Sequence, residues 1–394
     1  MVTPACPPPR IPIARLELGE PEIAAVRRVI ESGWISQGPE AEAFEREFAA
    51  FVGAPHAASV SSGTTALHCA LLAAGISAGD EVITVSHSFI ATANAVRYVG
   101  AMPVFVDIEA GGFNIDVDRV TEAIGPRTRA ILAVHQVGMP CDLPRLLTLA
   151  RAHGLLLIED AACAVGSEIL WRGHWTHIGA PIGDAACFSF HPRKVLTTGD
   201  GGMVTTPHTD WDSRIRSLRH HGMSVAAHVR HDASRVIVER YVEPGFNFRL
   251  TDLQAAIGRE QLRRLVGMVS RRRALAARYT AALSNQERLT TPQEPAWARS
   301  NWQSYCVGLH PSLDQLSVMQ QLLELGIATR RGVMCAHREP AWCGLGTWRC
   351  VGPAHRALRR SEEATDHGIV IPLWPSMDDA DQDRVVEALR ACTR

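Results

Sequence analysis

Short apolar runs rich in β-branched residues recur through the first half of the chain, and each predicts a buried strand. Segments with helical spacing lie between them, for example Ser88–Val99 and Leu143–His153. Strands that are apolar throughout and alternate with helices predict an α/β fold, with a mostly parallel sheet covered on both faces. The predicted strands are Glu81–Ser86, Pro103–Asp107, Ala130–His135, Leu155–Asp160, Ala185–His191 and Gly202–Thr206.

The pattern changes after about Gly258. Arg259–Tyr279 predicts one long helix, and its seven arginines are spread around it. This spread favours a solvated helix that links two domains over a nucleic-acid patch. We therefore expect a large domain over residues 1–258, followed by the linking helix and a smaller C-terminal α+β domain over residues 259–394. Elements of the smaller domain are predicted at Asn301–Leu309, Leu316–Leu325 and Asp378–Arg390.

Composition supports an ordinary globular protein. The 394 residues are 46% hydrophobic and 21% charged, with a net charge of −1. This balance argues against a nucleic-acid or anionic-membrane binder, which would carry a basic excess. No apolar run approaches the roughly 20 residues of a membrane span, and the proline-rich start does not resemble a signal peptide. We expect a cytoplasmic protein.

The ten cysteines include no C-x-x-C pair and are expected to be reduced core residues. Cys335, His337, Cys343 and Cys350 lie close together in the sequence, but their spacing fits no common zinc pattern. We expect no metal.

The candidate chemistry begins with one residue. Of the 40 lysines and arginines, 39 are arginine, and the single lysine is Lys194. A GC-rich genome explains the scarcity of lysine but not the retention of this one. Arginine can replace lysine at most charged surface sites, but not where an amine must lose its proton and attack a carbonyl. Lys194 is therefore a candidate Schiff-base residue, the alternative being a surface lysine kept by chance.

An acidic pair ends the predicted strand Leu155–Asp160, which comes before the strand that leads to Lys194. Glu159 and Asp160 stand at the carboxyl end, where such sheets bind ligands. Pyridoxal phosphate needs a carboxylate there to keep its ring nitrogen protonated. The alternative is that one of these acids only caps the next helix.

Three further segments fit the same cofactor. Ser61–Leu67 reads as a small-residue turn entering a helix, which provides backbone N–H groups for a phosphate, although Ser and Thr caps are common. Phe89 follows a strand directly and is placed to stack on a planar ring, unless it is an ordinary core residue. Gly199–Gly202 is a glycine turn that lets the backbone approach a ligand, or a simple tight connection.

Together these segments resemble the DegT/DnrJ/EryC1/StrS family of pyridoxal-phosphate-dependent sugar aminotransferases, over most of the chain. No single motif is decisive, but six occur in order at compatible spacing. They are Gly33–Pro39, Ser62–Leu67, Phe89–Asn94, Glu159–Ala162, Phe188–Lys194 with Thr198–Gly202, and Gly245–Leu250 with Leu253–Ala256.

The resemblance implies the aspartate-aminotransferase fold (PLP fold type I) and a homodimer with each site at the interface. It implies Lys194 as the Schiff-base and proton-transfer residue, Asp160 on the ring nitrogen and Phe89 on the ring. The implied phosphate residues are Gly63, Thr64, Thr65 and Ser189, with Asn247 from the second subunit.

The chain departs from the family pattern at some positions. Cys163 stands where Gln or His is frequent, near the ring's phenolic oxygen, and thiols bond more weakly. Asp200 replaces the usual Glu, and Trp171–Pro181 resembles a lengthened loop. Some relatives carry His in place of the lysine and dehydrate sugars, so Lys194 favours transamination.

The expected reaction moves an amino group from glutamate or glutamine to a keto-sugar, a nucleotide-linked 3- or 4-ketohexose. The alternatives are a keto-cyclitol aminotransferase of the kind found in aminoglycoside pathways and a non-catalytic cofactor-binding regulator. The loops Gly33–Gly38, Trp171–His177 and His220–Tyr241 are expected to set substrate choice. The expected substrate contacts are Trp34, Ser36, His191, Arg331 and His337, with Arg219 and Arg330 as further cations for a diphosphate.

Overall fold

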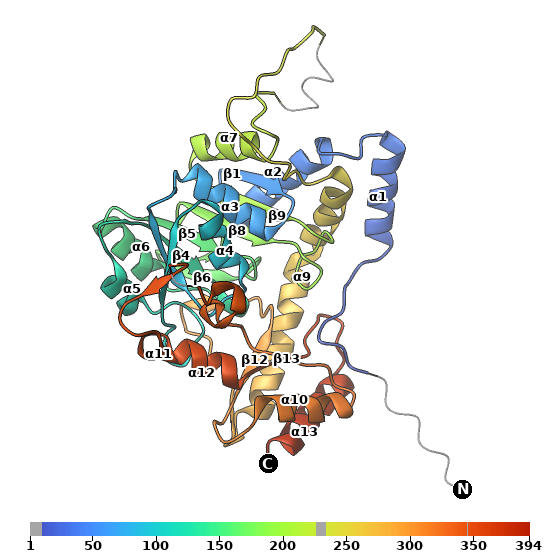
Figure 1. The fold of residues 1–394 in the computed structure, drawn as a ribbon. Helices are drawn as coiled ribbons and strands as arrows, with labels where there is room; N and C mark the ends of the chain where they lie inside the picture. Colours follow the sequence, from blue (N-terminus) through green and yellow to red (C-terminus); the bar gives the residue numbers. More distant parts are fainter. Residues whose placement is uncertain (1–9, 226–233, 345) are drawn as a thin grey trace.

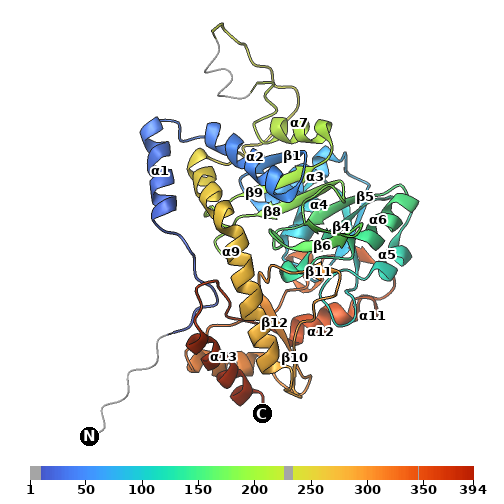
Figure 2. The same cartoon turned by 180° about the vertical axis from the view of Figure 1, so that it is seen from behind.

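The computed structural model describes residues 10–225, 234–344 and 346–394. Within these residues, a large sheet flanked by helices lies beside a smaller sheet formed by the C-terminal part of the chain (Figure 1). The long helix α9 (Asp252–Leu283) runs along the molecule from the first to the second, as the view from behind shows (Figure 2). A long helix is therefore present where the sequence predicts one.

The large sheet has eight strands in the described chain, in the order β1-β9-β8-β5-β4-β2-β3-β14. Strand β9 runs antiparallel to both of its neighbours, and the other pairs are parallel. The strands are β1 (His56–Val60), β2 (Glu81–Val85), β3 (Met102–Val106), β4 (Thr128–Val134), β5 (Leu156–Asp160), β8 (Ala185–Ser189), β9 (Gly202–Thr206) and β14 (Arg349–Cys350).

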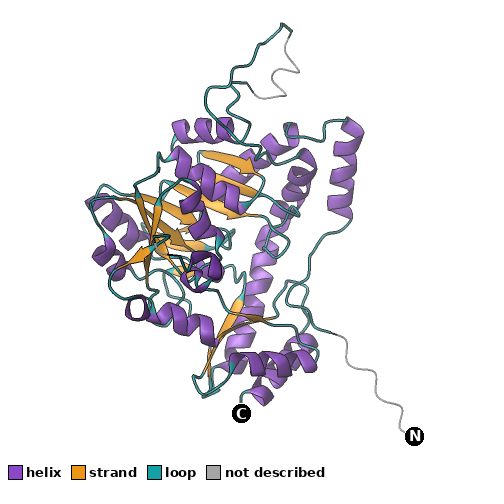
Figure 3. Ribbon diagram, in the orientation of Figure 1, coloured by secondary structure: helices purple, strands orange, loops and turns teal. Residues whose placement is uncertain are grey.

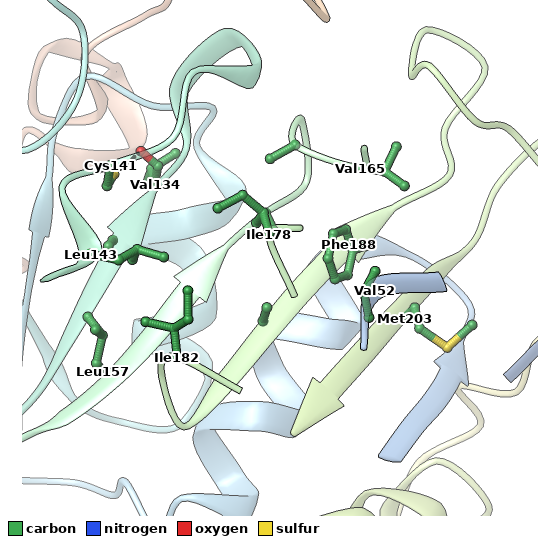
Figure 4. Packing of buried hydrophobic residues seen from close by; sticks show 14 of the residues in the cluster. Val52, Val134, Cys141, Leu143, Leu157, Val165, Ile178, Ile182, Phe188 and Met203 are labelled. Atoms are coloured by element: carbon green, nitrogen blue, oxygen red, sulfur yellow. Dashed lines mark hydrogen bonds between the residues drawn. The ribbon is translucent and has the colours of Figure 1, made fainter. Parts of the chain in front are cut away.

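Both faces of this sheet are buried. Since successive side chains of a strand point to opposite sides of the sheet, each strand contributes to two cores. In β4, Ile131 and Ala133 join one core, whereas Ala130 and Leu132 join the other. Figure 4 shows part of the first core, with Phe188 and Met203 of adjacent strands near Val52. The first core is covered by α2 (Pro39–Val52), α5 (Val117–Ala123) and α6 (Leu143–Ala152), and the second by α3 (Gly63–Ala73), α4 (Ala91–Tyr98) and α7 (Thr209–Leu218).

The C-terminal part is built on a smaller antiparallel sheet, in the order β10-β12-β15-β13 (Figure 3). Its core combines Tyr279 of α9 with Tyr305 and Trp374, all fully buried. The elements are β10 (Leu289–Thr290), β12 (Tyr305–Leu309), β13 (Arg330–Arg331), β15 (Gly368–Ile371), α10 (Gln315–Glu324), α11 (Ala354–Ala357), α12 (Arg359–His367) and α13 (Asp379–Cys392).

The predicted α/β fold with its mostly parallel sheet is confirmed, and each predicted strand of the large sheet is present. The linking helix begins earlier than expected, at Asp252, because Thr251 and Gln254 form a capping box there. The expected division between residues 258 and 259 therefore falls inside a helix. The N-terminal helix α1 (Glu20–Ser32) packs against this same helix.

Part of the C-terminal region belongs to the large sheet. Strand β14 pairs in parallel with β3, aligning Arg349 with Val104. Nearby, Trp342 and Leu358 are buried with Phe105 of β3 in one apolar cluster. The boundary between the two parts therefore does not follow the order of the sequence.

The stretch Trp171–Pro181, expected to be a lengthened loop, contains the turn and the second strand of a β-hairpin. Strand β6 (Glu168–Trp171) pairs with β7 (His174–His177), and β11 (Ala298–Arg299) adds a third strand. The two turn residues, Arg172 and Gly173, have φ of 49° and 84°, as tight hairpin turns that match strand twist require. Among the described helices, none has the length and apolar character needed to cross a membrane.

Candidate active site

Lys194 lies in the turn that follows β8, at the carboxyl edge of the large sheet. The turn is closed by a hydrogen bond from its backbone N–H to the carbonyl of His191, at 2.8 Å. Its side chain is half-buried, and Nζ donates a hydrogen bond to Sγ of Cys163 at 3.0 Å. The single lysine of the chain is therefore held inside a site and is not a freely solvated surface residue.

Asp160 ends the neighbouring strand β5 and is 5% exposed. Its Oδ2 accepts a hydrogen bond from the Thr92 hydroxyl at 2.7 Å, and its Oδ1 accepts one from the Ala162 N–H at 3.2 Å. Ser88 lies 2.7 Å from the Thr92 hydroxyl. Because β5 and β8 are parallel neighbours, their ends bring Asp160 and the Lys194 turn to the same edge of the sheet.

A second buried acid lies behind Asp160. Glu159 is 1% exposed, and its Oε2 lies 2.9 Å from Nε2 of His135, which is fully buried. The Nδ1 of His135 accepts a hydrogen bond from the Cys141 N–H at 3.0 Å, so Nε2 is the nitrogen that donates to Glu159. The His135 backbone N–H also donates to the Asp160 carbonyl at 3.1 Å. The two acids of the motif thus differ in role, with Glu159 paired internally.

The start of helix α3 forms the predicted phosphate turn. Ser62 caps the helix by accepting a hydrogen bond from the Thr65 N–H at 3.1 Å. Among the hydrogen bonds of the described residues, none uses the N–H groups of Gly63 or Thr64. A Cβ added at Gly63 would lie 2.7 Å from Cβ of Ser189, the last residue of β8. The two expected phosphate segments therefore meet, and they meet only because position 63 has no side chain.

Phe89 lies in the connection between β2 and α4, at the same edge of the sheet. Its side chain is 64% exposed, which is unusual for a large aromatic residue. The alternative interpretation of Phe89 as a core residue is therefore wrong. The Phe89 carbonyl accepts the N–H of Thr92 at 3.1 Å, the residue that binds Asp160, so the exposed ring belongs to the segment that borders the buried carboxylate.

The residues expected to contact the substrate differ in their exposure and in their internal hydrogen bonds. Ser36 is exposed, and the Trp34 indole N–H donates to the Gln37 carbonyl at 3.1 Å. His191 belongs to the Lys194 turn, where its Nδ1 accepts the Arg193 N–H at 3.2 Å. Burial, followed by the nearby Arg193 charge, lowers the pKa of His191, which favours its neutral form.

The other proposed cations are mostly engaged elsewhere. His337 is buried, with Nδ1 2.6 Å from the Ser86 hydroxyl and Nε2 3.0 Å from Glu362, so neither ring nitrogen is left for a substrate. Arg219 is 6% exposed and pairs with Glu45 at 2.5 Å. These two expectations are corrected by the structure, because both side chains serve internal contacts.

Arg330 and Arg331 form the exposed strand β13, and Arg331 pairs with Glu339 at 3.0 Å. Asn247 is exposed, and its backbone pairs with that of His220. The Phe248 carbonyl accepts the Ser61 N–H at 2.8 Å, so this segment borders the phosphate turn. The loop expected to set substrate choice at His220–Tyr241 lies partly outside the described residues.

The sequence interpretation left two contributing residues unassigned. Thr92 lies within the recognised aromatic segment, three positions after Phe89, where a helical turn brings it back toward the site. His135 is the last residue of the predicted strand Ala130–His135, and the end of a strand is a signal for the ligand edge of a sheet. No group of three or more potential metal ligands occurs among the described residues.

Comparison with known proteins finds relatives that are similar over most of the chain. The chain is 39% identical, over 377 residues covering 95% of it and 94% of the relative, to the spore coat polysaccharide biosynthesis protein SpsC of Bacillus subtilis. The solved structure of DesV from S. venezuelae, in complex with a ketimine intermediate, has 35% identity and a TM-score of 0.87, covering 98% and 99% of the two chains. Spr1654 from Streptococcus pneumoniae shares the fold, with 24% identity, a TM-score of 0.87 and 98% of each chain covered, and is solved in PLP and PMP forms.

The predicted aminotransferase activity and pyridoxal phosphate cofactor are confirmed by these findings. The described residues also fit the cofactor, since a buried carboxylate, an amine, an exposed aromatic ring and free helix N–H groups share one edge of the sheet. The model of the DegT/DnrJ/EryC1/StrS aminotransferase family matches residues 17–390, and the chain belongs to this family.

Proposed function

We propose that this protein transfers an amino group from glutamate or glutamine to a keto-sugar, a nucleotide-linked 3- or 4-ketohexose. The observation that carries the proposal is the convergence of Lys194 and Asp160 at adjacent strand ends. The resemblance to a polysaccharide biosynthesis protein over 95% of the chain supports a sugar as the acceptor.

Lys194 is the residue that reacts. Pyridoxal phosphate, when bound, supplies a ring that accepts electrons from the bond broken at the donor's α-carbon. Lys194 would hold the cofactor through Nζ, and its free amine would take the proton from the donor's α-carbon. Its placement beside Cys163 keeps the free amine inside the site.

The other residues bind and orient. Asp160, oriented by the Thr92 hydroxyl, would keep the ring nitrogen protonated. Gly63, Thr64, Thr65 and Ser189 would hold the phosphate, where the start of α3 provides N–H groups and a favourable dipole. Phe89 would cover the ring, and Cys163 adjoins the lysine.

We further propose a homodimer whose sites lie at the interface. Val236, Val238, Tyr241 and Val242 are exposed in one stretch, with 91%, 81%, 62% and 65% of their surfaces accessible. Apolar side chains gathered in this way are typical of a protein interface. Asn247, exposed beyond this stretch, is then available to the phosphate site of a second copy.

An absorbance titration tests the function. Purified protein loaded with pyridoxal phosphate should show a visible band that one amino donor, L-glutamate or L-glutamine, removes. The aminated enzyme is then mixed with keto-sugars, nucleotide-linked and free, and with keto-cyclitols, and the band is followed. Return of the band only with nucleotide-linked ketohexoses supports the proposal, whereas return only with keto-cyclitols contradicts the sugar assignment.

A further inference from the structure

The backbone on both sides of Lys194 is held by one side chain. The amide of Gln303 accepts a hydrogen bond from the Val195 N–H at 2.9 Å and donates one to the Arg193 carbonyl at 2.5 Å. These two groups belong to the peptide units that flank Lys194. Gln303 is 9% exposed, so both bonds are shielded from water.

Two residues before Gln303, Asn301 binds the backbone of the turn that carries Cys163, the residue bonded to the Lys194 amine. Its Nδ2 donates to the carbonyls of Cys163 and Val165, each at 2.8 Å. Asn301 is fully buried, and its Oδ1 accepts the Gln303 N–H at 2.8 Å. The Cys163 turn is thereby connected to Gln303, which holds the backbone on both sides of Lys194.

The segment Asn301–Gln303 is fixed in its turn by the long helix. Arg272 of α9 donates to the Trp302 carbonyl at 2.9 Å and to the Gln303 carbonyl at 2.7 Å. Trp302 has a φ of 51°, which is costly for a bulky residue and persists only where its surroundings enforce it. Residues in such conformations cluster at functional sites.

We propose that Gln303 and Asn301 are positioning residues of the active site, setting where the Lys194 amine stands relative to Cys163. Gln303 fixes the lysine from both flanking peptides, and Asn301 fixes the Cys163 turn. The inference rests on the proposed function only in taking Lys194 as the reacting amine. A misplaced amine would transfer protons slowly while donor binding stays intact, since geometry matters most in the chemical step.

The test compares Gln303→Leu with the matched control Gln315→Leu. Gln315 also makes two backbone hydrogen bonds through its amide, to the carbonyls of Thr365 and Gly368 at 2.9 and 2.7 Å, but within the smaller sheet region. Both variants lose two such bonds, so their stability losses should be similar. With cofactor-loaded enzyme, Gln303→Leu should slow the donor half-reaction about tenfold or more with unchanged donor affinity, whereas Gln315→Leu should change neither.

A second readout does not depend on turnover. Because the chain has one lysine, protein labelled with nitrogen-15 lysine has a single Nζ resonance, which reports Lys194 directly in the full-length chain. Gln303→Leu should shift this resonance, and Gln315→Leu should not. A Gln303→Leu protein with wild-type rate and resonance, or equal changes in both variants, would overturn the inference.

Two further outcomes are informative. If Gln303→Leu does not fold, Gln303→Glu keeps the acceptor for the Val195 N–H but loses the donor to Arg193, and the same slowing is expected. A Gln303→Glu protein with the wild-type rate would then contradict the inference. Failure of wild-type protein to form the visible band would count against the proposed function, and the Lys194 resonance would still decide whether Gln303 positions the amine.

Discussion

The hydroxyl of Thr92 donates a hydrogen bond to Oδ2 of Asp160 at 2.7 Å, and both residues are more than nine-tenths buried. A hydroxyl has one proton to donate, so the Ser88 hydroxyl, 2.7 Å away, must donate to Thr92. Two hydroxyls in series thus end on the carboxylate. Hydrogen bonds to charged groups are the strong ones, so this short chain fixes the carboxylate's orientation.

Replacing Thr92 by valine should therefore slow the reaction. Valine keeps the shape of the side chain but removes the proton that Asp160 accepts, at a cost of about 1.5–3 kcal/mol. We expect the donor half-reaction to slow about tenfold or more, measured by stopped-flow absorbance. Thr92→Ser retains the hydroxyl and should stay much closer to wild type, while equal rates for all three proteins would exclude this role.

Substitution of the single lysine should abolish the chemistry. Lys194→Ala and Lys194→Arg both lack the amine that bonds the cofactor, and arginine keeps the positive charge. We expect both variants to lose the visible band and nearly all turnover, with folding checked by circular dichroism. An arginine variant that turned over at the wild-type rate would contradict the assignment of Lys194.

A methyl group at position 63 should weaken cofactor binding. The new Cβ would lie 2.7 Å from Cβ of Ser189, so the two phosphate segments must separate. We expect Gly63→Ala to raise the cofactor dissociation constant about tenfold or more, measured by fluorescence titration. Gly267→Ala is the matched control, because nothing lies within 4 Å of its added Cβ in α9. It should leave cofactor binding unchanged and stabilise the helix by about 1 kcal/mol.

Glu45 should contribute to stability in a pH-dependent way. Burial alone would raise its pKa, but Arg219 and Arg216 outweigh burial and lower the pKa from 4.5 to about 2. Because the folded pKa lies below the unfolded one, the contribution is present above pH 4.5 and is lost as the pH falls toward 2. The lowering corresponds to on the order of 3 kcal/mol.

The pH-dependent contribution of Glu45 to the free energy of unfolding is measured by urea unfolding of the wild type and of Glu45→Gln at several pH values. The variant leaves Arg219 buried beside a neutral partner and should be less stable at pH 7, by about 3–5 kcal/mol. The difference should shrink as the pH falls below 4.5. A difference that stays constant with pH would show that the Glu45 charge is not what stabilises the pair.

The apolar pattern predicted the centre of the large sheet well, because strands buried on both faces are nearly continuous in hydrophobicity. It missed β14, where a polar arginine and a cysteine pair with β3 at the sheet edge. It also missed the β6–β7 hairpin, whose short strands read Glu-Ile-Leu-Trp and His-Trp-Thr-His and are only partly buried. Strand β14, and strand β11 that pairs with β6, depend on partners distant in sequence, which no local pattern specifies.

The residues of the site also divide into those that local motifs predict and those that only folding brings together. Lys194, Asp160 and the start of α3 lie in compact motifs at or just after the ends of strands, where the topology alone predicts a common edge. Gln303 lies in an irregular segment more than a hundred residues from Lys194, and only the folded chain brings them together. His337 and Arg219 were assigned by charge, which does not reveal that each already has an internal partner.

The pairing of β14 with β3 has a consequence for the order in which the molecule is made. On the ribosome, β3 emerges well before the strand that covers its outer edge, which comes from Arg349 and Cys350, more than 200 residues later. Uncovered strand edges attract other chains, and long-range pairings form slowly. Until Arg349 and Cys350 have emerged, the nascent chain therefore carries an open strand edge, the kind of surface that chaperones shield.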